Sequence, residues 1–154
     1  LPKAYGLVLL ANIIIAGLTI VVLSFKVSAA RKKYREKAMK DGEKDAEARF
    51  SYPNLYVEGN TENAKLFNCA QRGHQQALET YTQFVTFSLV SGISFPVATA
   101  LCGLVWSVSR YYWASGYAKG DPNKRYEHFL GAGIWFALIG VLLGATGAAV
   151  KILL

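Results

Sequence analysis

The chain has 154 residues, of which 53% are hydrophobic and 18% charged, and its formal net charge is +7 at pH 7. The length suits one domain, and the apolar excess favours a membrane protein over a soluble globular one. The positive charge does not indicate nucleic-acid binding, because the basic residues gather at the ends of apolar runs, where lysine and arginine meet lipid headgroups.

Four apolar runs are long enough to cross a bilayer, which takes about 20 helical residues. They are expected at about 4–29, 67–93, 96–118 and 126–153. The first is too long for the apolar region of a signal peptide and is expected to be a retained membrane helix. Pro96 suits the start of the third run, and Gly140 and Gly144 suit close packing of the fourth. The sequence therefore predicts an all-α integral membrane four-helix bundle.

The connections between these runs are unequal. Residues 31–65 form a long charged connection, either a solvated loop or an extension of the first helix that weakens at Gly42. A tight turn near Ser94 and Phe95 joins the second and third runs, and KGDPNKR (119–125) joins the third and fourth. The long connection and KGDPNKR must share one side, which carries most of the basic residues. The positive-inside rule therefore predicts that both face the cytosol and that the termini lie on the far side.

Polar residues form a stripe on the second run. Asn68, Arg72, Gln76, Glu79 and Gln83 are spaced by four, four, three and four residues, which places them on one helix face. Charged residues inside a membrane are costly unless they face protein, water or a partner. Arg72 and Glu79 are two turns apart, which disfavours a direct ion pair, so they are predicted to hold opposite ends of a zwitterionic ligand. A purely structural polar network is the alternative.

The third run repeats this pattern with Trp106, Arg110, Trp113 and Tyr117. Trp106 and Tyr111 are expected to belong to an aromatic belt at the membrane interface. Tyr117 shares a face with Arg110 and is a better candidate for a site.

Several candidates come from the cytosolic ends of the runs: Arg31, Arg72, Tyr117 and Arg125. They are predicted to converge on one pocket. Arginines beside a glutamate suit a small molecule with two carboxylates and one ammonium group, because a guanidinium matches a carboxylate in bidentate geometry. Cys69 and Cys102 form no metal or redox motif and are expected to be reduced and buried, and no metal site is predicted.

FNCAQRGHQQALETY (67–81) and ALCGLVWSVSRYYWASGYAKGDPNKR (100–125) resemble the MAPEG superfamily of membrane-associated proteins in eicosanoid and glutathione metabolism. Within it, the microsomal glutathione transferase 3 type is the most similar. The resemblance extends over nearly the whole chain and includes SAARKKY (28–34). Residues 37–58 make the first connection longer than is usual in the family.

The resemblance implies a homotrimer that binds glutathione between neighbouring subunits near the cytosolic face. It implies that Arg31 and Arg72 hold glutathione carboxylates, that Glu79 meets the ammonium group, and that His74, Gln76 and Tyr117 make further polar contacts. Arg125, or Lys124 if the loop is shifted by one residue, is implied to activate the thiol, and Arg110 is implied to face the site. Gln76 replaces the usual asparagine, and Trp113 replaces a tyrosine that contacts glutathione.

The implied function is that of a membrane-bound glutathione S-transferase or peroxidase. An arginine near the sulfur lowers the pKa of the thiol, which is ordinarily about 8.5. The thiolate then attacks a lipophilic electrophile or reduces a lipid hydroperoxide that arrives from the membrane lipids along a groove lined by the first and fourth spans. Glutathione is the co-substrate. The endoplasmic reticulum or the outer mitochondrial membrane is expected, with the active site facing the cytosol.

Two other functions are open. The chain is alternatively a non-catalytic relative that binds lipid or serves as an accessory subunit of a larger membrane complex, with the charged insert 37–58 as a docking surface. The basic residues of KGDPNKR favour activity and Trp113 disfavours it. A small channel or transporter is less well supported, because the sequence has no inverted repeat and no interrupted helix pair.

Overall fold

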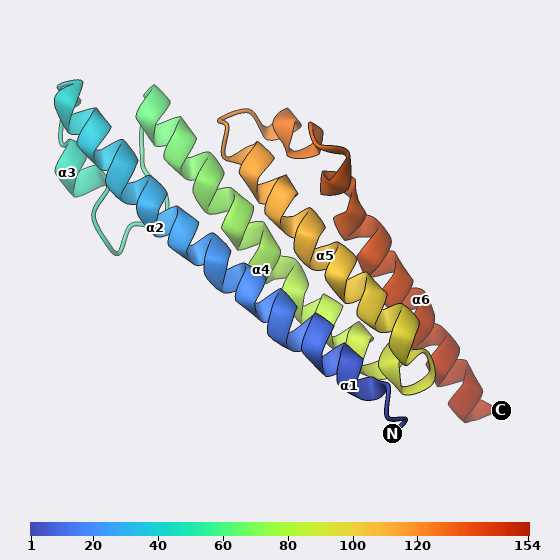
Figure 1. Cartoon of the computed structure of the whole chain (residues 1–154). Helices are drawn as coiled ribbons and strands as arrows, with labels where there is room; N and C mark the ends of the chain where they lie inside the picture. The colour runs from blue at the N-terminus through green and yellow to red at the C-terminus, as the bar shows by residue number, and fades with distance from the viewer.

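The computed structural model describes residues 1–154 and consists of helices without strands, so the predicted all-α fold class is confirmed. Four long helices lie side by side (Figure 1). The first is continuous over Tyr5–Lys40, and the others are α4 (Glu62–Ser94), α5 (Pro96–Tyr117) and α6 (Gly133–Leu153). Both termini lie at one end of the molecule, opposite the two longer connections.

The first helix has three segments: α1 (Tyr5–Val8), the π-helical turns Leu9–Ile15, and α2 (Ala16–Lys40). It extends well beyond residue 29, the predicted end of the first span, because RKKYREKAMK (31–40) consists mostly of strong helix formers. The helix ends just before Gly42, which has a positive φ of 69°. Of the two arrangements considered for residues 31–65, the chain therefore adopts the helical extension for 31–40.

Residues 41–61, which we call the cap, fold onto the adjoining ends of α2 and α4. The cap contains the short helix α3 (Ala46–Arg49). Its buried cluster combines residues of the cap with residues of both long helices: Ala38, Ala46, Phe50, Val57, Ala64 and Phe67. Arg49 donates to the carbonyl oxygen of Glu58 at 2.6 Å and pairs with Glu43 at 3.1 Å. The cap is thus a packed structure with its own apolar core.

The boundaries of the later helices follow from local hydrogen bonds. Phe95 leaves the helical path and Pro96 begins α5, at the predicted tight turn. After α5, two short 3₁₀ turns (Pro122–Tyr126 and Phe129–Ala132) precede α6, which begins at Gly133 rather than at residue 126. The side chains of Asp121 and His128 accept backbone N–H groups two residues ahead, which favours short turns over a continuous helix.

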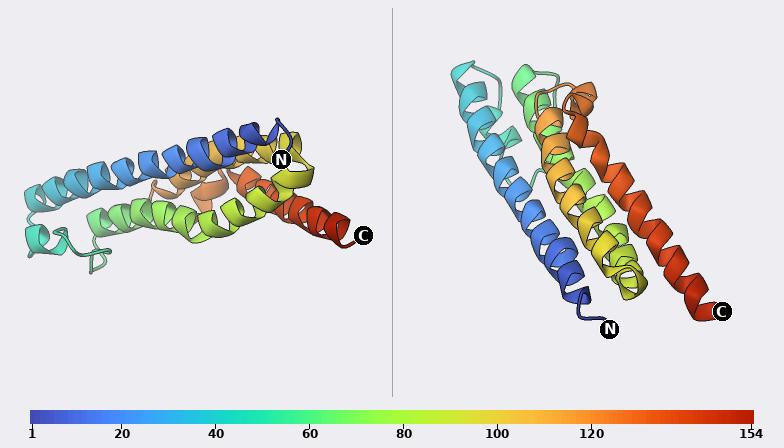
Figure 2. Two further views of the ribbon diagram at one scale, coloured as in Figure 1. Left: turned by 90° about the horizontal axis from the view of Figure 1, so that it is seen from below. Right: turned by 45° about the vertical axis from the view of Figure 1, so that its right-hand side comes forward.

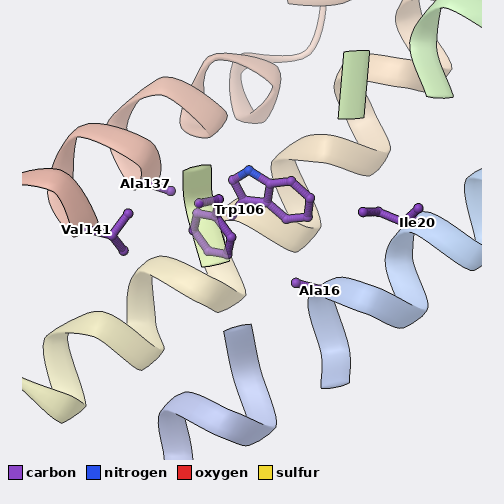
Figure 3. Close-up of a cluster of buried hydrophobic side chains, with 6 residues drawn as sticks. Ala16, Ile20, Trp106, Ala137 and Val141 are labelled. Atoms are coloured by element: carbon purple, nitrogen blue, oxygen red, sulfur yellow. The ribbon is translucent and has the colours of Figure 1, made fainter. Parts of the chain in front are cut away.

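The core lies where α4 and α5 pack between the outer helices. Trp106 of α5 is fully buried, and its neighbours come from the other three helices: Ala16, Ile20, Phe84, Ala137 and Val141 (Figure 3). The prediction that Trp106 belongs to an interfacial belt is therefore wrong, because its indole fills the space between helices. Gly140 and Gly144 allow close packing, since an added Cβ would lie 2.9 Å from Cys102 Sγ and 2.0 Å from Ser91 Oγ.

The first helix and α6 lie at opposite edges of the molecule, with α4 and α5 between them (Figures 1 and 2). A groove lined by these two helices is therefore not formed within one chain.

Two helices, Tyr5–Lys40 and Phe129–Leu153, are long and apolar enough to cross a membrane by length and composition. α4 and α5 carry most of the buried polar side chains, which lowers their overall hydropathy: Ser88, Ser91, Thr99, Ser107, Ser109 and Arg110. Asn12 joins this interior, donating to Ser88 Oγ at 2.8 Å and to the Thr99 carbonyl at 3.0 Å. Large apolar side chains on all four long helices point outward, as lipid contact requires.

Candidate functional site

A polar pocket of about 450 Å³ lies where the cap, α4 and the end of α5 meet. It is lined by Tyr56, Gly59, Asn60, Lys65, Asn68, Cys69, Arg72 and Tyr117. Arg72 and Tyr117 were predicted site residues, and the structure brings them to one pocket although they lie on different helices. Asn68 forms this wall by exchanging two hydrogen bonds of 2.8 Å with the backbone of Val57.

Arg72 and Glu79 form a direct ion pair, with 2.7 Å between Nη1 and Oε1. The expectation that two helical turns separate them too far is wrong, because both long side chains extend along the helix toward each other. The pair is only partly buried, with the two side chains 39% and 46% exposed. It therefore presents a positive and a negative group side by side near the pocket.

Arg125 lies against Tyr117. Its guanidinium carbon is 6.0 Å from the Tyr117 ring centroid and 5.1 Å from that of Tyr126, and no acidic side chain pairs with it. Two glycines allow this approach: a Cβ on Gly116 would lie 2.2 Å from the Lys124 carbonyl oxygen, and one on Gly131 2.5 Å from that of Arg125. The connection after α5 is thus held tightly over the end of that helix.

Lys124 faces a different pocket. That pocket measures about 360 Å³ and is lined by Tyr112, Ser115, Gly116, Lys119, Lys124, Glu127 and His128. Neither Arg72 nor Tyr117 contributes to it. Of the two residues considered for activation of a thiol, the geometry therefore brings Arg125 to Tyr117 and leaves Lys124 elsewhere.

Arg110 is almost fully buried, at 1% exposure, and does not face the pocket. Its Nη1 donates to Gln76 and its Nη2 donates to Thr80 Oγ1 at 2.8 Å, while the guanidinium lies between the rings of Trp106 and Trp113. The expectation that it faces the site is wrong within one chain, because the side chain is buried and both of its terminal nitrogens donate to residues of α4. Arg110 fixes α5 to α4 and holds the Gln76 amide.

Arg31 and His74 line another pocket of about 200 Å³, between α2, the cap and α4. Arg31 donates to the carbonyls of Phe50 and Asn54 at 3.1 and 2.7 Å. Its guanidinium also lies over the rings of Tyr52 and Phe67. The predicted convergence of Arg31 with Arg72 is not found within one chain, because the two arginines line different pockets. Arg31 shares its pocket with His74, which is only two residues further along α4 than Arg72 but lies on a different face of the helix.

Trp113 is 4% exposed and packs beside Tyr117, with 5.2 Å between ring centroids. Both cysteines are free, and Cys69 is buried against the Arg72 pocket. Sequence reasoning missed Tyr56, Asn60 and Lys65. Lys65 had a signal, since it precedes Arg72 by seven residues and so shares its helix face. Tyr56 and Asn60 had none, because their place depends on how the cap folds.

The arrangement offers a cation–anion pair, two tyrosines, amides and a nearby arginine without an acidic partner. Such a site suits a small polar ligand that carries both charge signs. The model of the MAPEG family matches residues 8–148 of the chain, which include all or most of each of the four long helices and the residues around this pocket. The match confirms the resemblance at the level of the family. Together with the apolar helices, it shows an integral membrane protein.

Proposed function

The chain belongs to the MAPEG family, and from this premise we propose that it is a membrane-bound glutathione transferase or peroxidase of the microsomal glutathione transferase 3 type. The family includes glutathione transferases and related enzymes and uses glutathione as substrate. The observation that carries the proposal is the position of Arg125 beside Tyr117, a residue that lines the same pocket as Arg72.

Arg125 is proposed to stabilise the glutathione thiolate. A thiol of pKa about 8.5 is only a few per cent ionised at neutral pH, and a nearby guanidinium favours the anion. In the transferase reaction the thiolate forms a carbon–sulfur bond with the electrophile, and either a leaving group departs from that carbon with the bonding electrons or an activated carbon–carbon double bond opens and takes up a proton. In the peroxidase reaction it breaks the O–O bond of a lipid hydroperoxide, and a second glutathione completes a disulfide while alcohol and water are released. The chain's part in both is to position and ionise the thiol.

The Arg72–Glu79 pair is proposed to bind the amino-acid end of glutathione, which carries one carboxylate and one ammonium group. The Arg72 guanidinium complements the carboxylate of the ligand, and the Glu79 carboxylate complements its ammonium group. Both side chains are partly exposed and therefore accessible to the ligand. Tyr117 adds a hydroxyl at the pocket, and Gln76 is oriented by Arg110. Trp113 offers a ring in place of the family's tyrosine hydroxyl.

A homotrimer is proposed because the predicted ligand residues lie on two faces of one chain. Arg72 and Tyr117 line one pocket, with Arg125 beside Tyr117, and Arg31 and His74 line another. A neighbouring subunit would contribute His74 as a ligand contact, and Arg31 as the residue that positions the cap. The same contact brings α2 beside a neighbour's α6 and so forms a groove for a lipophilic substrate. A native mass measurement in mild detergent should give three chains.

All four long helices are proposed to span the membrane, with the cap and residues 118–132 in the cytosol. The support is the gathering of lysine and arginine at that end, which the positive-inside rule places in the cytosol. The endoplasmic reticulum and the outer mitochondrial membrane both fit this orientation. Labelling of an engineered cysteine in the cap by an impermeant reagent on intact organelles tests it.

A measurement of thiolate formation distinguishes Arg125 from Lys124 as the residue that ionises the glutathione thiol. Ultraviolet absorbance of the thiolate is recorded as glutathione is added to the purified protein, to Arg125→Ala and to Lys124→Ala. The thiolate signal should be lost in Arg125→Ala and retained in Lys124→Ala, which alters a different pocket. An Arg125→Ala protein with the wild-type signal contradicts the assignment, as does selective loss in Lys124→Ala.

An accessory subunit is the second candidate, and the surface of the cap favours it. Tyr52 and Leu55 of the cap are 71% and 51% exposed. The proposed enzymatic function assigns no role to these exposed apolar side chains, whereas a partner protein could cover them. A stoichiometric partner after gentle extraction, together with no thiolate signal in the wild type, would support this function over catalysis.

A further inference from the structure

An apolar cavity that contains two lysines lies between α2, α4 and α5. It measures about 320 Å³, and most of its lining residues are hydrophobic. The others are Lys26, Lys33, His74 and Ser115, and no lining residue is acidic. The cavity therefore offers an occupant both an apolar wall and positive charge, a combination that suits an amphiphile with a negatively charged headgroup.

This cavity is separate from the pockets assigned to glutathione. It shares no lining residue with the pocket of Arg72 and Tyr117. It shares only Val27 and His74 with the pocket of Arg31, and α5 contributes to the cavity but not to that pocket. The two lysines line neither of these pockets, so the proposed enzymatic function assigns no role to them.

Both lysines are exposed, and neither forms an ion pair. Lys26 donates to Ser115 Oγ at 3.1 Å, and its Nζ lies 3.8 Å from the ring centroid of Tyr111. The Nζ of Lys33 lies 5.3 Å from the ring centroid of Tyr34. An ammonium group has three N–H donors, so both lysines keep donors for an anion in the cavity.

The acidic residues around the cavity are not paired with these lysines. Glu36 follows Lys33 by about one turn of α2, but it is exposed and forms no ion pair. Glu127 lines the neighbouring pocket that shares Ser115, and its carboxylate is paired with Lys119. An anion in the cavity therefore meets two ammonium groups without competing for them against a bound carboxylate.

The two lysines lie where the apolar part of the first helix ends. Seven residues separate Lys26 from Lys33, which places them on one face of α2, about 10 Å apart along its axis. The charged run RKKYREKAMK (31–40) begins between them. Lysine and tyrosine at such positions contact lipid headgroups. The anion that this cavity meets most directly is therefore a headgroup phosphate.

An apolar surface continues from the cavity toward the middle of the membrane, where α2 and α5 lie side by side (Figure 2). Tyr111, Val108 and Leu104 precede Ser115 by four, seven and eleven residues, so they share its face of α5. All three are exposed, as is Val22, which lies one turn before the first lysine on α2. A lipid whose headgroup is bound at the lysines thus has an apolar path for an acyl chain.

We propose that this cavity binds one acidic phospholipid per chain, with the phosphate at Lys26 and Lys33 and an acyl chain along the exposed face of α5. Acidic phospholipids are enriched in the cytoplasmic leaflet, where this end of the molecule is proposed to lie. Phospholipids are the main amphiphiles of a leaflet, which favours this occupant over a free fatty acid. The bound lipid links α2 to α5 close to the cap.

Native mass spectrometry of the full-length protein in mild detergent tests the assignment. The protein is mixed with equal amounts of phosphatidylglycerol and phosphatidylcholine that carry the same acyl chains, and the lipid-bound masses are compared. The wild type should retain phosphatidylglycerol roughly twentyfold more strongly, because each lysine beside an anionic lipid contributes roughly fivefold. Binding should saturate at one such lipid per chain.

Variants with matched charge locate the effect. Lys26→Gln/Lys33→Gln should lose the preference, and Lys33→Gln alone, beyond the apolar part of the helix, should lose roughly fivefold. Lys26→Arg/Lys33→Arg should retain it. The control Lys32→Gln/Lys37→Gln removes the same charge from exposed positions of α2 that line neither the cavity nor the three pockets, and it should behave like the wild type.

Four results would overturn the inference. A wild type that binds both lipids equally has no acidic-lipid site, and equal losses in Lys33→Gln and the control would mean that membrane-proximal charge, rather than the cavity, selects the lipid. Displacement of phosphatidylglycerol by equimolar oleate would assign the cavity to a fatty acid. A co-purified protein that prevents lipid binding would assign this face to a protein partner. None of these measurements involves glutathione, so the proposed function stands or falls separately.

Discussion

The four arginines of the predicted site differ in the groups that already bind them. Arg31 is held by cap carbonyls and Arg110 by Gln76 and Thr80, so both act within the fold. Arg72 is paired with an acid but half-exposed, and Arg125 lies on a tyrosine ring without an acid. Only the last two have charge to offer a ligand.

Replacement of either member of the Arg72–Glu79 pair should weaken glutathione binding. Arg72→Gln and Glu79→Gln are each expected to raise the Kd about tenfold, the cost of one charged hydrogen bond. Gln83→Ala is the control, because Gln83 is exposed further along α4 and lines none of the three pockets described. Wild-type affinity in both pair variants would mean that the pair is only structural.

The sequence predicted the types and the spacing of the charged site residues, but it did not predict which groups they contact. The helical period predicted that Arg72 and Glu79 share a face, but direct pairing depends on how two long side chains extend. Gln76 meets Arg110 across 34 positions of sequence, which no local pattern reveals. Trp106 was misassigned because a tryptophan near an arginine occurs both at membrane interfaces and in helix cores.

At the scale of elements, the connection after α5 positions Arg125. Gly116→Ala should displace it, because the new Cβ would lie 2.2 Å from the Lys124 carbonyl oxygen, which belongs to the backbone. We expect kcat to fall roughly tenfold or more, since a shift of about 1 Å at a reacting group has effects of that size. Glutathione affinity should change far less.

Gly6→Ala is the matched control for this glycine, because no heavy atom lies within 4 Å of its added Cβ. Equal kcat values for wild type and Gly116→Ala in steady-state assays would show that the connection does not position a catalytic group.

The cap should loosen in acid through Glu43. Burial raises the pKa of Glu43, but hydrogen bonds from Asn63, Thr61 and Arg49, with the charge of Arg49, outweigh it and hold the pKa below 4.5. A carboxyl with a lowered folded-state pKa contributes stability that is present above its unfolded pKa. That stability is lost as the pH falls through its folded pKa.

Thermal unfolding of wild type and Glu43→Gln between pH 6 and pH 3 measures this effect. The wild type should be the more stable protein near pH 6, and the difference should shrink below about pH 4.5, the ordinary pKa of the group. A difference that stays constant with pH would show that Glu43 does not stabilise the cap through its charge.

At the scale of the whole molecule, the sequence predicted the fold class and the family, because apolar runs and local motifs are written in consecutive residues. The folding of the cap was open, since it depends on contacts between Phe50, Val57 and Phe67 from distant segments. The distribution of the site over two faces of the chain also follows from tertiary packing alone. The proposal of a homotrimer rests on this distribution.

If this chain binds glutathione and ionises its thiol, binding must release the thiol proton. Titration calorimetry at neutral pH in buffers of different ionisation enthalpy counts the protons released on binding. Glutathione should release close to one proton per site and S-methylglutathione, which has no thiol, should release none. Glutathione that binds without releasing a proton would show that the chain does not ionise the thiol, and glutathione that does not bind would contradict the proposed function.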